Sequence, residues 1–275
     1  MRITTLSENT AGTIGLLAEW GLSILVEADG LQVLLDTGGG IAAASNAPAL
    51  GVDLRRTDRI VLSHGHADHT GGLREVLRVM GKKVEIIAHP DVWQAKFAER
   101  DGQYRYVGIP FQQVELESRG ASFIPAREPV WLSENVVASG EIPMRTPFEQ
   151  VEGNLYVREA ETFLPESLAD DQALVVRTAN GLAVVLGCAH HGIINTLYRA
   201  QEITGVDRVH TVVGGTHLYR ASPERLELTI AALQKFGIRK LGVSHCTGFA
   251  ASARMAAEFG DRFFLNNAGM SLTVP

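Results

Sequence analysis

The chain has 275 residues, of which 45% are hydrophobic and 20% are charged, a balance that excludes an intrinsically disordered protein. Its 31 acidic residues outnumber its 25 basic residues, and the formal net charge is −6. Because proteins that bind nucleic acid usually carry a basic surplus, we expect no nucleic-acid partner. No apolar run approaches the length of a membrane span, so we expect no membrane partner either.

Cysteine usage and the N-terminal residues predict the cellular setting. Cys188 and Cys246 form no CxxC pair and no disulfide framework, which is typical of a reducing compartment. The segment from Met1 to Glu8 lacks the apolar stretch of a secretion signal. We therefore expect a soluble cytoplasmic protein. The sequence carries no signal for its oligomeric state.

In the first third of the chain, short apolar runs end in turns. Two runs around Ala28-Asp29-Gly30 predict a β-hairpin, and a third run ends at a histidine-rich turn. Apolar residues at helical spacing after Gly72 predict a helix. In chain order we expect strands at Leu22–Glu27, Leu31–Leu35 and Arg59–Leu62, a helix from Leu73 to Met80, a strand at Val84–Ala88 and a helix from about Asp91 to Glu99.

The middle of the chain is less regular. Gly102–Phe111 is rich in aromatic residues, and Glu141–Asp171 shows little periodicity. A long stretch without regular structure inside a compact domain is usually a lid or a binding loop. We therefore expect an irregular cap around residues 141–171.

The last third alternates strands with helices. Asn180-Gly181 predicts a hairpin turn, and Pro223 suits the first turn of a helix. This alternation is typical of a layered α/β fold, and without a linker or a repeat we predict a single domain over residues 1–275. We expect strands at Gln172–Thr178, Leu182–Leu186, Val209–Val213 and Lys240–Ser244, and helices at about Ile193–Thr204, Pro223–Lys235 and Ala250–Phe259.

A dense group of metal-ligand residue types follows the predicted strand Arg59–Leu62. His64, His66, Asp68 and His69 lie within six residues of each other, next to small Gly and Ala residues. In an extended chain, His64 and His66 point to the same side. Imidazole nitrogen and carboxylate oxygen suit Zn, Fe or Mn. A histidine-rich surface loop is the alternative, but four such residues at a strand end favour a metal site.

Two later histidines also follow predicted strands. His190 comes after Leu182–Leu186, and His245 comes after Lys240–Ser244. In α/β sheets, sites form at the carboxyl ends of strands, so the three segments are mutually consistent. Taken singly, each late histidine is as readily a buried structural residue as a ligand. As a set they favour a shared metal centre.

The pattern His64-x-His66-x-Asp68-His69, with Asp36 after an early strand, resembles the metallo-β-lactamase fold superfamily. The chain is also similar, over nearly its whole length, to the subfamily that includes archaeal 7,8-dihydropterin-6-methyl-4-(β-D-ribofuranosyl)aminobenzene 5′-phosphate synthases. The stretches that carry this likeness, besides the histidine motif, are Gly21-Leu22-Ser23, Leu35-Asp36-Thr37-Gly38, Gly140-Glu141-Ile142-Pro143, Gly187-Cys188-Ala189-His190, Gly214-Gly215-Thr216-His217-Leu218 and Ser244-His245-Cys246-Thr247-Gly248.

The resemblance implies an αβ/βα sandwich, in which two central mixed β-sheets are flanked by helices and metals bind at one edge. It suggests one metal held by His64, His66 and His190, and a second held by Asp68, His69 and His245. The cofactors would be one or two divalent metal ions, with Zn favoured and Mn, Fe or Mg as alternatives.

The chain departs from the superfamily pattern at one position. Many members have a bridging Asp directly after the glycine that is here Gly187, and this chain has Cys188 there. Cys188 is a ligand, a small buried thiol or irrelevant to the metals, and Asp171 is an alternative carboxylate. Asp36 is expected to support the histidine loop through hydrogen bonds rather than to bind metal.

These features predict a metal-dependent enzyme that acts on a small anionic or phosphorylated substrate. The reaction would be hydrolysis by metal-activated water, or condensation of a dihydropterin diphosphate with an aminobenzene ribose phosphate. Asp68 would accept a proton, and His217 would donate a hydrogen bond to an oxyanion. The alternative is a metal-binding scaffold or sensor without turnover.

The candidate substrate contacts lie outside the metal motifs and are Arg145, Glu141 and Tyr106. Arg145, in the irregular stretch after Glu141, suits a phosphate because its guanidinium can donate two parallel hydrogen bonds. Tyr106 belongs to a set of aromatic residues that could stack on a flat heterocycle. An exposed arginine without a role, and aromatic residues that pack a cap against the core, are the alternatives.

Overall fold

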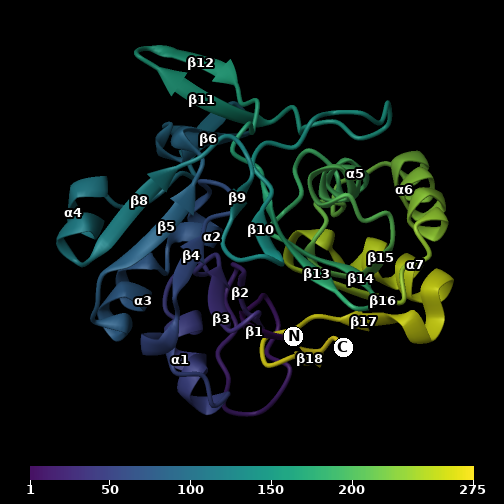
Figure 1. Ribbon diagram of the computed structural model, residues 1–275. Helices are drawn as coiled ribbons and strands as arrows, with labels where there is room; N and C mark the ends of the chain where they lie inside the picture. Colours follow the sequence, from purple (N-terminus) through teal and green to yellow (C-terminus); the bar gives the residue numbers. More distant parts are fainter.

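The computed structural model describes residues 1–275 and contains two seven-stranded β-sheets and one four-stranded sheet (Figure 1). The first large sheet contains β1 (Arg2–Ser7), β2 (Ser23–Ala28), β3 (Leu31–Leu35), β4 (Arg59–Val61), β5 (Val84–Ala88), β8 (Ala121–Pro125) and β18 (Ser271–Thr273). Its order is β18-β1-β2-β3-β4-β5-β8. The strands from β18 to β3 are antiparallel, and those from β3 to β8 are parallel.

The second large sheet comes mainly from the C-terminal half of the chain. It contains β9 (Val130–Trp131), β10 (Val136–Ala138), β13 (Ala173–Thr178), β14 (Gly181–Leu186), β15 (Val209–Gly215), β16 (Lys240–Ser244) and β17 (Phe263–Leu265). Its order is β17-β16-β15-β14-β13-β10-β9, with parallel pairing from β14 to β17. Both large sheets are therefore mixed.

The third sheet lies above one end of the two large sheets and is called the cap sheet below (Figure 1). It contains β6 (Lys96–Arg100), β7 (Gln103–Tyr106), β11 (Leu155–Glu159) and β12 (Thr162–Pro165), in the order β12-β11-β6-β7.

Helices cover the outer face of each large sheet (Figure 1). Those on the first sheet are α1 (Ala42–Ala49), α3 (Leu73–Met80) and α4 (Gln113–Ser118), and those on the second are α5 (Ile193–Thr204), α6 (Pro223–Lys235) and α7 (Phe249–Phe259). The short helix α2 (Ala67–Thr70) follows β4, and 3₁₀ turns lie at η1 (Leu54–Arg56), η2 (Pro90–Trp93), η3 (His245–Thr247) and η4 (Gly260–Arg262). None of these helices is long and apolar enough to cross a membrane.

Alternation along the strands explains the layers. In β2, Ile24 and Val26 face the second sheet, whereas Leu25 faces the helices of its own half. In β14, Val185 faces the first sheet and Val184 faces α5 to α7. One apolar layer is thus shared by the two sheets, and one lies under each set of helices. The predicted αβ/βα sandwich is confirmed, and the single domain stays a prediction that this shared layer favours.

Most predicted elements lie where the sequence places them, and two predictions are wrong. The predicted helix Asp91–Glu99 is the turn η2 followed by strand β6, and the predicted irregular cap contains the strands β11 and β12. Both errors have one cause. These segments pair with each other across the cap sheet, with Leu155 opposite Ala98, so partners distant in sequence decide their conformation rather than local periodicity.

Candidate metal centre

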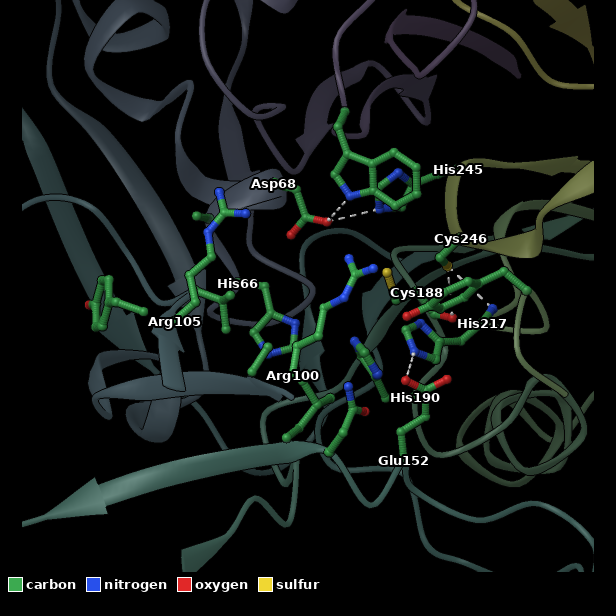
Figure 2. Close-up of a pocket in the computed structure, with 18 residues that line it drawn as sticks. His66, Asp68, Arg100, Arg105, Glu152, Cys188, His190, His217, His245 and Cys246 are labelled. Carbon is green, nitrogen blue, oxygen red and sulfur yellow. Dashed lines mark hydrogen bonds and ion pairs between the residues drawn. The ribbon is translucent and has the colours of Figure 1, made fainter. Parts of the chain in front are cut away.

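The site lies at the edge where strands of both large sheets end. His64, His66, Asp68 and His69 follow β4, His190 follows β14, His217 follows β15 and His245 follows β16. Figure 2 shows several of these side chains converging on one cavity. The topology therefore brings together histidines from distant parts of the chain, as the sequence predicts.

His64, His66 and His190 form the first donor group. One ligand atom from each lies within 4.8 Å of the others, and the Nε2 atoms of His64 and His190 are 3.3 Å apart. All three side chains are buried, and Nδ1 of His190 has no hydrogen-bond partner. Burial and the neighbouring histidines hold the pKa values of His64 and His190 well below the usual range. Both rings are therefore neutral at pH 7, the form that binds a metal.

Asp68, His69 and His245 form the second donor group. Oδ2 of Asp68 lies 3.2 Å from Nε2 of His245 and accepts a hydrogen bond from Nε1 of Trp20 at 3.1 Å. Burial opposes the charge on Asp68, but His69 and His245 outweigh it and hold its pKa below the usual range. Asp68 is therefore a carboxylate at neutral pH, able to bind a cation or accept a proton.

Cys188 lies between the two donor groups. Its Sγ is 3.1 Å from Nε2 of His69. Its Sγ lies within 4.8 Å of the ligand atoms of three residue pairs, and each pair with Cys188 could hold a metal ion. The pairs are His64 and His69, His190 and His217, and His245 and Cys246. Cys188 is therefore near both donor groups, and a thiolate is a donor that Zn accepts. Asp171 instead accepts a hydrogen bond from the backbone of His191 and belongs to none of these groups.

Asp36 holds the histidine loop in place. Its carboxylate accepts hydrogen bonds from the backbone N–H of Ser63 at 2.7 Å and from the Ser63 hydroxyl at 2.6 Å. Oδ2 also lies 2.7 Å from Nδ1 of His69. An N–H on Nδ1 leaves Nε2 of His69 for a cation, so this geometry supports the proposed supporting role of Asp36.

A buried charge cluster fixes the other side of the site. Lys96 of β6, fully buried, contacts Glu166 and lies 3.0 Å from the carboxylate of Asp170. Glu166 in turn lies 3.4 Å from Nε2 of His66, and Asp170 accepts a hydrogen bond from the backbone N–H of Gly65 at 2.8 Å. The cluster connects the cap sheet to the histidine loop and leaves Nδ1 of His66 as the free ring nitrogen. Sequence reasoning missed it, because neither spacing nor composition marks these three residues as partners.

The cavity over the donors has a volume of about 600 Å³. Its walls include Trp20, Tyr106 and Tyr219, and Figure 2 shows Arg100 and Arg105 on the same side of the view as His66. This volume lies within the usual range of small-molecule sites.

His217 also lines this cavity, with its Nε2 3.2 Å from a carboxylate oxygen of Glu152. Burial lowers its pKa, but Cys246 and Glu152 outweigh burial and raise the pKa of His217 to about 10. A protonated His217 can donate to an oxyanion, as predicted. It also lies close enough to Cys188 and His190 to bind a metal, so both roles fit its position.

Two of the three predicted substrate contacts lie away from the cavity. Arg145 pairs with Glu202 at 2.5 Å on α5, and Glu141 contacts His89 and Arg127 at 2.9 Å each. Neither lines the cavity, and their charges are satisfied by these ion pairs. Of the three predicted substrate contacts, only Tyr106 lines the cavity.

Comparison with known proteins identifies the family. The model of the metallo-β-lactamase superfamily matches residues 21–158, which include the histidine motif and half of the chain. The chain belongs to the metallo-β-lactamase superfamily. The resemblance that the sequence motifs suggest is thus confirmed at the level of the family.

Individual metallo-β-lactamase superfamily proteins are similar to this chain over its whole length. It is 32% identical to the 7,8-dihydropterin-6-methyl-4-(β-D-ribofuranosyl)-aminobenzene-5′-phosphate synthase of Methanocaldococcus jannaschii, over 98% of this chain and 95% of that one. The crystal structure of Tm1679, a metal-dependent hydrolase of the β-lactamase superfamily, shares 30% identity and a TM-score of 0.85, with 100% and 99% of the two chains covered. Zn²⁺-bound PqqB of Methylobacterium extorquens, at 13% identity and a TM-score of 0.60 over the full length of both chains, shares the fold.

These relationships indicate that the chain is an enzyme. They decide against the alternative of a scaffold without turnover. They leave the reaction itself to be inferred from the site.

Proposed function

We propose that this metallo-β-lactamase superfamily member is a divalent-metal-dependent enzyme that acts on a small anionic or phosphorylated substrate. His64, His66 and His190 would hold one cation, and Asp68, His69 and His245 a second, with Cys188 between them. The observation that carries the proposal is that these donors gather at the base of one cavity, and that His190 and His245 each have a buried ring nitrogen without a hydrogen-bond partner. Zn suits this mixture of imidazole, carboxylate and thiolate best.

A bound divalent cation supplies Lewis acidity and offsets negative charge on the substrate. Residues of the chain supply proton transfer and hydrogen-bond donation. The carboxylate of Asp68 faces the cavity and accepts a proton from the attacking nucleophile, while Trp20 and His245 fix its orientation. His217, held by Glu152, donates a hydrogen bond to an oxygen that gains charge in the reaction.

Two reactions fit these roles. The likeness to the pterin-related synthase favours condensation, in which an aromatic amine displaces diphosphate from a dihydropterin diphosphate. The likeness to Tm1679 favours hydrolysis of a phosphoester, lactone or thioester by activated water. In condensation Asp68 takes the proton of the amine, and in hydrolysis it takes the proton of water.

One experiment separates these reactions. Purified protein loaded with Zn, Mn or Fe is assayed with a dihydropterin diphosphate plus an aminobenzoate-type amine, and in parallel with phosphodiester, lactone and thioester substrates. Metal-dependent release of diphosphate only when the amine is present supports condensation, and turnover without an amine supports hydrolysis. A protein that binds no divalent cation under any of these conditions contradicts the proposal as a whole.

A further inference from the structure

The cap sheet presents one of its faces to the cavity. Strand pairing places Ala98 opposite both Arg105 and Leu155, and Arg100 lies two residues beyond Ala98. Because side chains alternate along a strand, all four point to the same side of the sheet. All four also line the cavity that contains the metal donors. Arg100 and Arg105 are the charged side chains of this face that line the cavity, and both are cationic.

The opposite face of the cap sheet is aromatic. Tyr104 stacks on Phe163 with ring centroids 3.8 Å apart, and Phe97 and Tyr156 pack against these two rings edge to face. These rings pack against one another on the face of the sheet opposite Arg100 and Arg105. The face that bears Arg100 and Arg105 is therefore the charged face over the cavity, and among the aromatic residues of the cap sheet only Tyr106 also lines the cavity.

The two arginines are free to bind an anion. Arg105 has no ion-pair partner, and Arg100 has only its neighbour Asp101, 3.7 Å away, in a pair whose side chains are 84% and 91% exposed. Such a pair contributes little, so a ligand can displace it. Figure 2 shows Arg100 and Arg105 on the same side of the view as His66, with His217 and Cys246 on the other side.

We propose that Arg100 and Arg105 form a subsite for a phosphoryl group of the substrate, on the cap-sheet wall of the cavity. The planar guanidinium donates two parallel hydrogen bonds to phosphate oxygens, which a single ammonium cannot do. The inference rests on the proposed function, because it assigns the reacting end of the substrate to the metal donors and an anionic end to the cap sheet. It replaces Arg145, which the sequence suggested for this role.

The subsite is tested by calorimetric titration of phenylphosphonate, an aromatic phosphomonoester analogue that is not hydrolysed. The double variant Arg100→Met/Arg105→Met keeps the apolar stems and removes both charges. Arg158→Met is the matched control, because Arg158 is an exposed arginine of the same sheet that points to its aromatic face, opposite Phe163. Each protein is measured with metal bound and after chelation, and benzyl alcohol serves as the uncharged probe.

We expect the double variant to bind phenylphosphonate at least roughly tenfold more weakly than the unchanged protein, both with and without metal. Arg158→Met should match the unchanged protein, and benzyl alcohol should not distinguish any of the three. Equal phenylphosphonate affinity in the double variant, or binding that disappears with the metal and ignores the arginines, would overturn the subsite. Failure of the proposed function would appear separately, as a protein that retains no divalent cation. In that case the phenylphosphonate affinities of the unchanged protein and the double variant, compared after chelation, still test the arginine subsite.

Discussion

At the residue scale, His66 combines two tasks that most buried histidines do not share. Its ring belongs to a donor group with His64 and His190, while its Nε2 is held at 3.4 Å by Glu166. The ring is therefore oriented from outside the cavity before any cation arrives. This arrangement reduces the entropy lost on metal binding, since the ligand is already in place.

We predict that His66→Ala abolishes both metal retention and turnover. The substitution removes a donor from the first group and leaves Glu166 without its imidazole partner. Elemental analysis after gel filtration and the substrate assays check both effects. His210→Ala is the control, because His210 lies on β15, belongs to none of the donor groups, and its ring hydrogen-bonds with the hydroxyl of Thr211. A His66→Ala protein with full metal content and activity would remove His66 from the ligand set.

A second residue-scale prediction concerns protons. Burial lowers the pKa of His69, but Asp36 and Asp68 outweigh it and raise the pKa to about 9, so in the metal-free protein this ring is charged at pH 7. Burial also raises the pKa of the Cys188 thiol. A cation must displace these protons, so binding at pH 7 should release roughly one to two protons and tighten as the pH rises toward 9. Calorimetry in buffers of different ionisation enthalpy measures this release, and metal binding without it would contradict the assignment of His69 and Cys188.

At the scale of elements, the ends of β4 and β14 approach each other very closely. Gly187, directly after β14, has no room for a Cβ, because that atom would overlap the side chain of Ser63 and lie 3.1 Å from Asp36. Glycine at this position lets the second sheet deliver Cys188 to the histidine loop. The close approach therefore sets the distance between Cys188 and the histidine loop.

Gly187→Ala should accordingly destabilise the fold by about 1–3 kcal/mol and weaken metal binding, since one strand end must move away from the other. Gly153→Ala is the matched control, because a Cβ at Gly153 meets nothing within 4 Å. Urea denaturation and metal titration of the two variants provide the comparison. Identical metal affinity in both would show that the approach of the two strands is not needed to place Cys188.

The cap sheet depends on an unusual anchor, the fully buried Lys96. Lys96→Met leaves the carboxylates of Glu166 and Asp170 buried without a cation, and breaking a buried pair in this way costs about 3–5 kcal/mol. We expect a loss of this size in the free energy of unfolding, measured in urea. Lys83→Met, at an exposed position before β5, should change it by no more than about 0.5 kcal/mol. A small effect of Lys96→Met would mean that the cluster is not what holds the cap.

The elements that the sequence predicts well are those in which local pattern and tertiary role agree. Helices α5 and α6 and strand β16 have the predicted bounds, because an amphipathic repeat or an apolar run is itself the signal. Strand β6 fails this test. Its sequence, Lys-Phe-Ala-Glu-Arg, shows no apolar alternation, and pairing with β7 and β11 makes the segment extended. The histidine motif was predictable since its ligands are adjacent in sequence. Lys96, Glu166 and Arg100 were not, because their roles exist only after the cap sheet has formed.

At the scale of the whole molecule, the proposed metal centre joins the two halves. Its donors come from the first sheet through the loop after β4, and from the second sheet through the ends of β14 and β16. A cation bound there is in contact with both halves, and it stabilises the folded state only, since the donors are scattered in the unfolded chain.

We predict that chelation lowers the melting temperature without splitting the transition. At a free metal concentration 1,000 times the dissociation constant, the bound cation contributes about 4 kcal/mol. Because an apolar layer is shared by both sheets, we expect one cooperative transition with and without metal. Differential scanning calorimetry tests both points, and two separate transitions after chelation would contradict the predicted single domain.

The long sequence separation between the donors also affects how the protein is made. His64 leaves the ribosome early, whereas His245 lies close to the C-terminus. A chain that has not yet formed β14 and β16 offers only part of the proposed donor set. We therefore expect full metal affinity to arise only when the second sheet is complete.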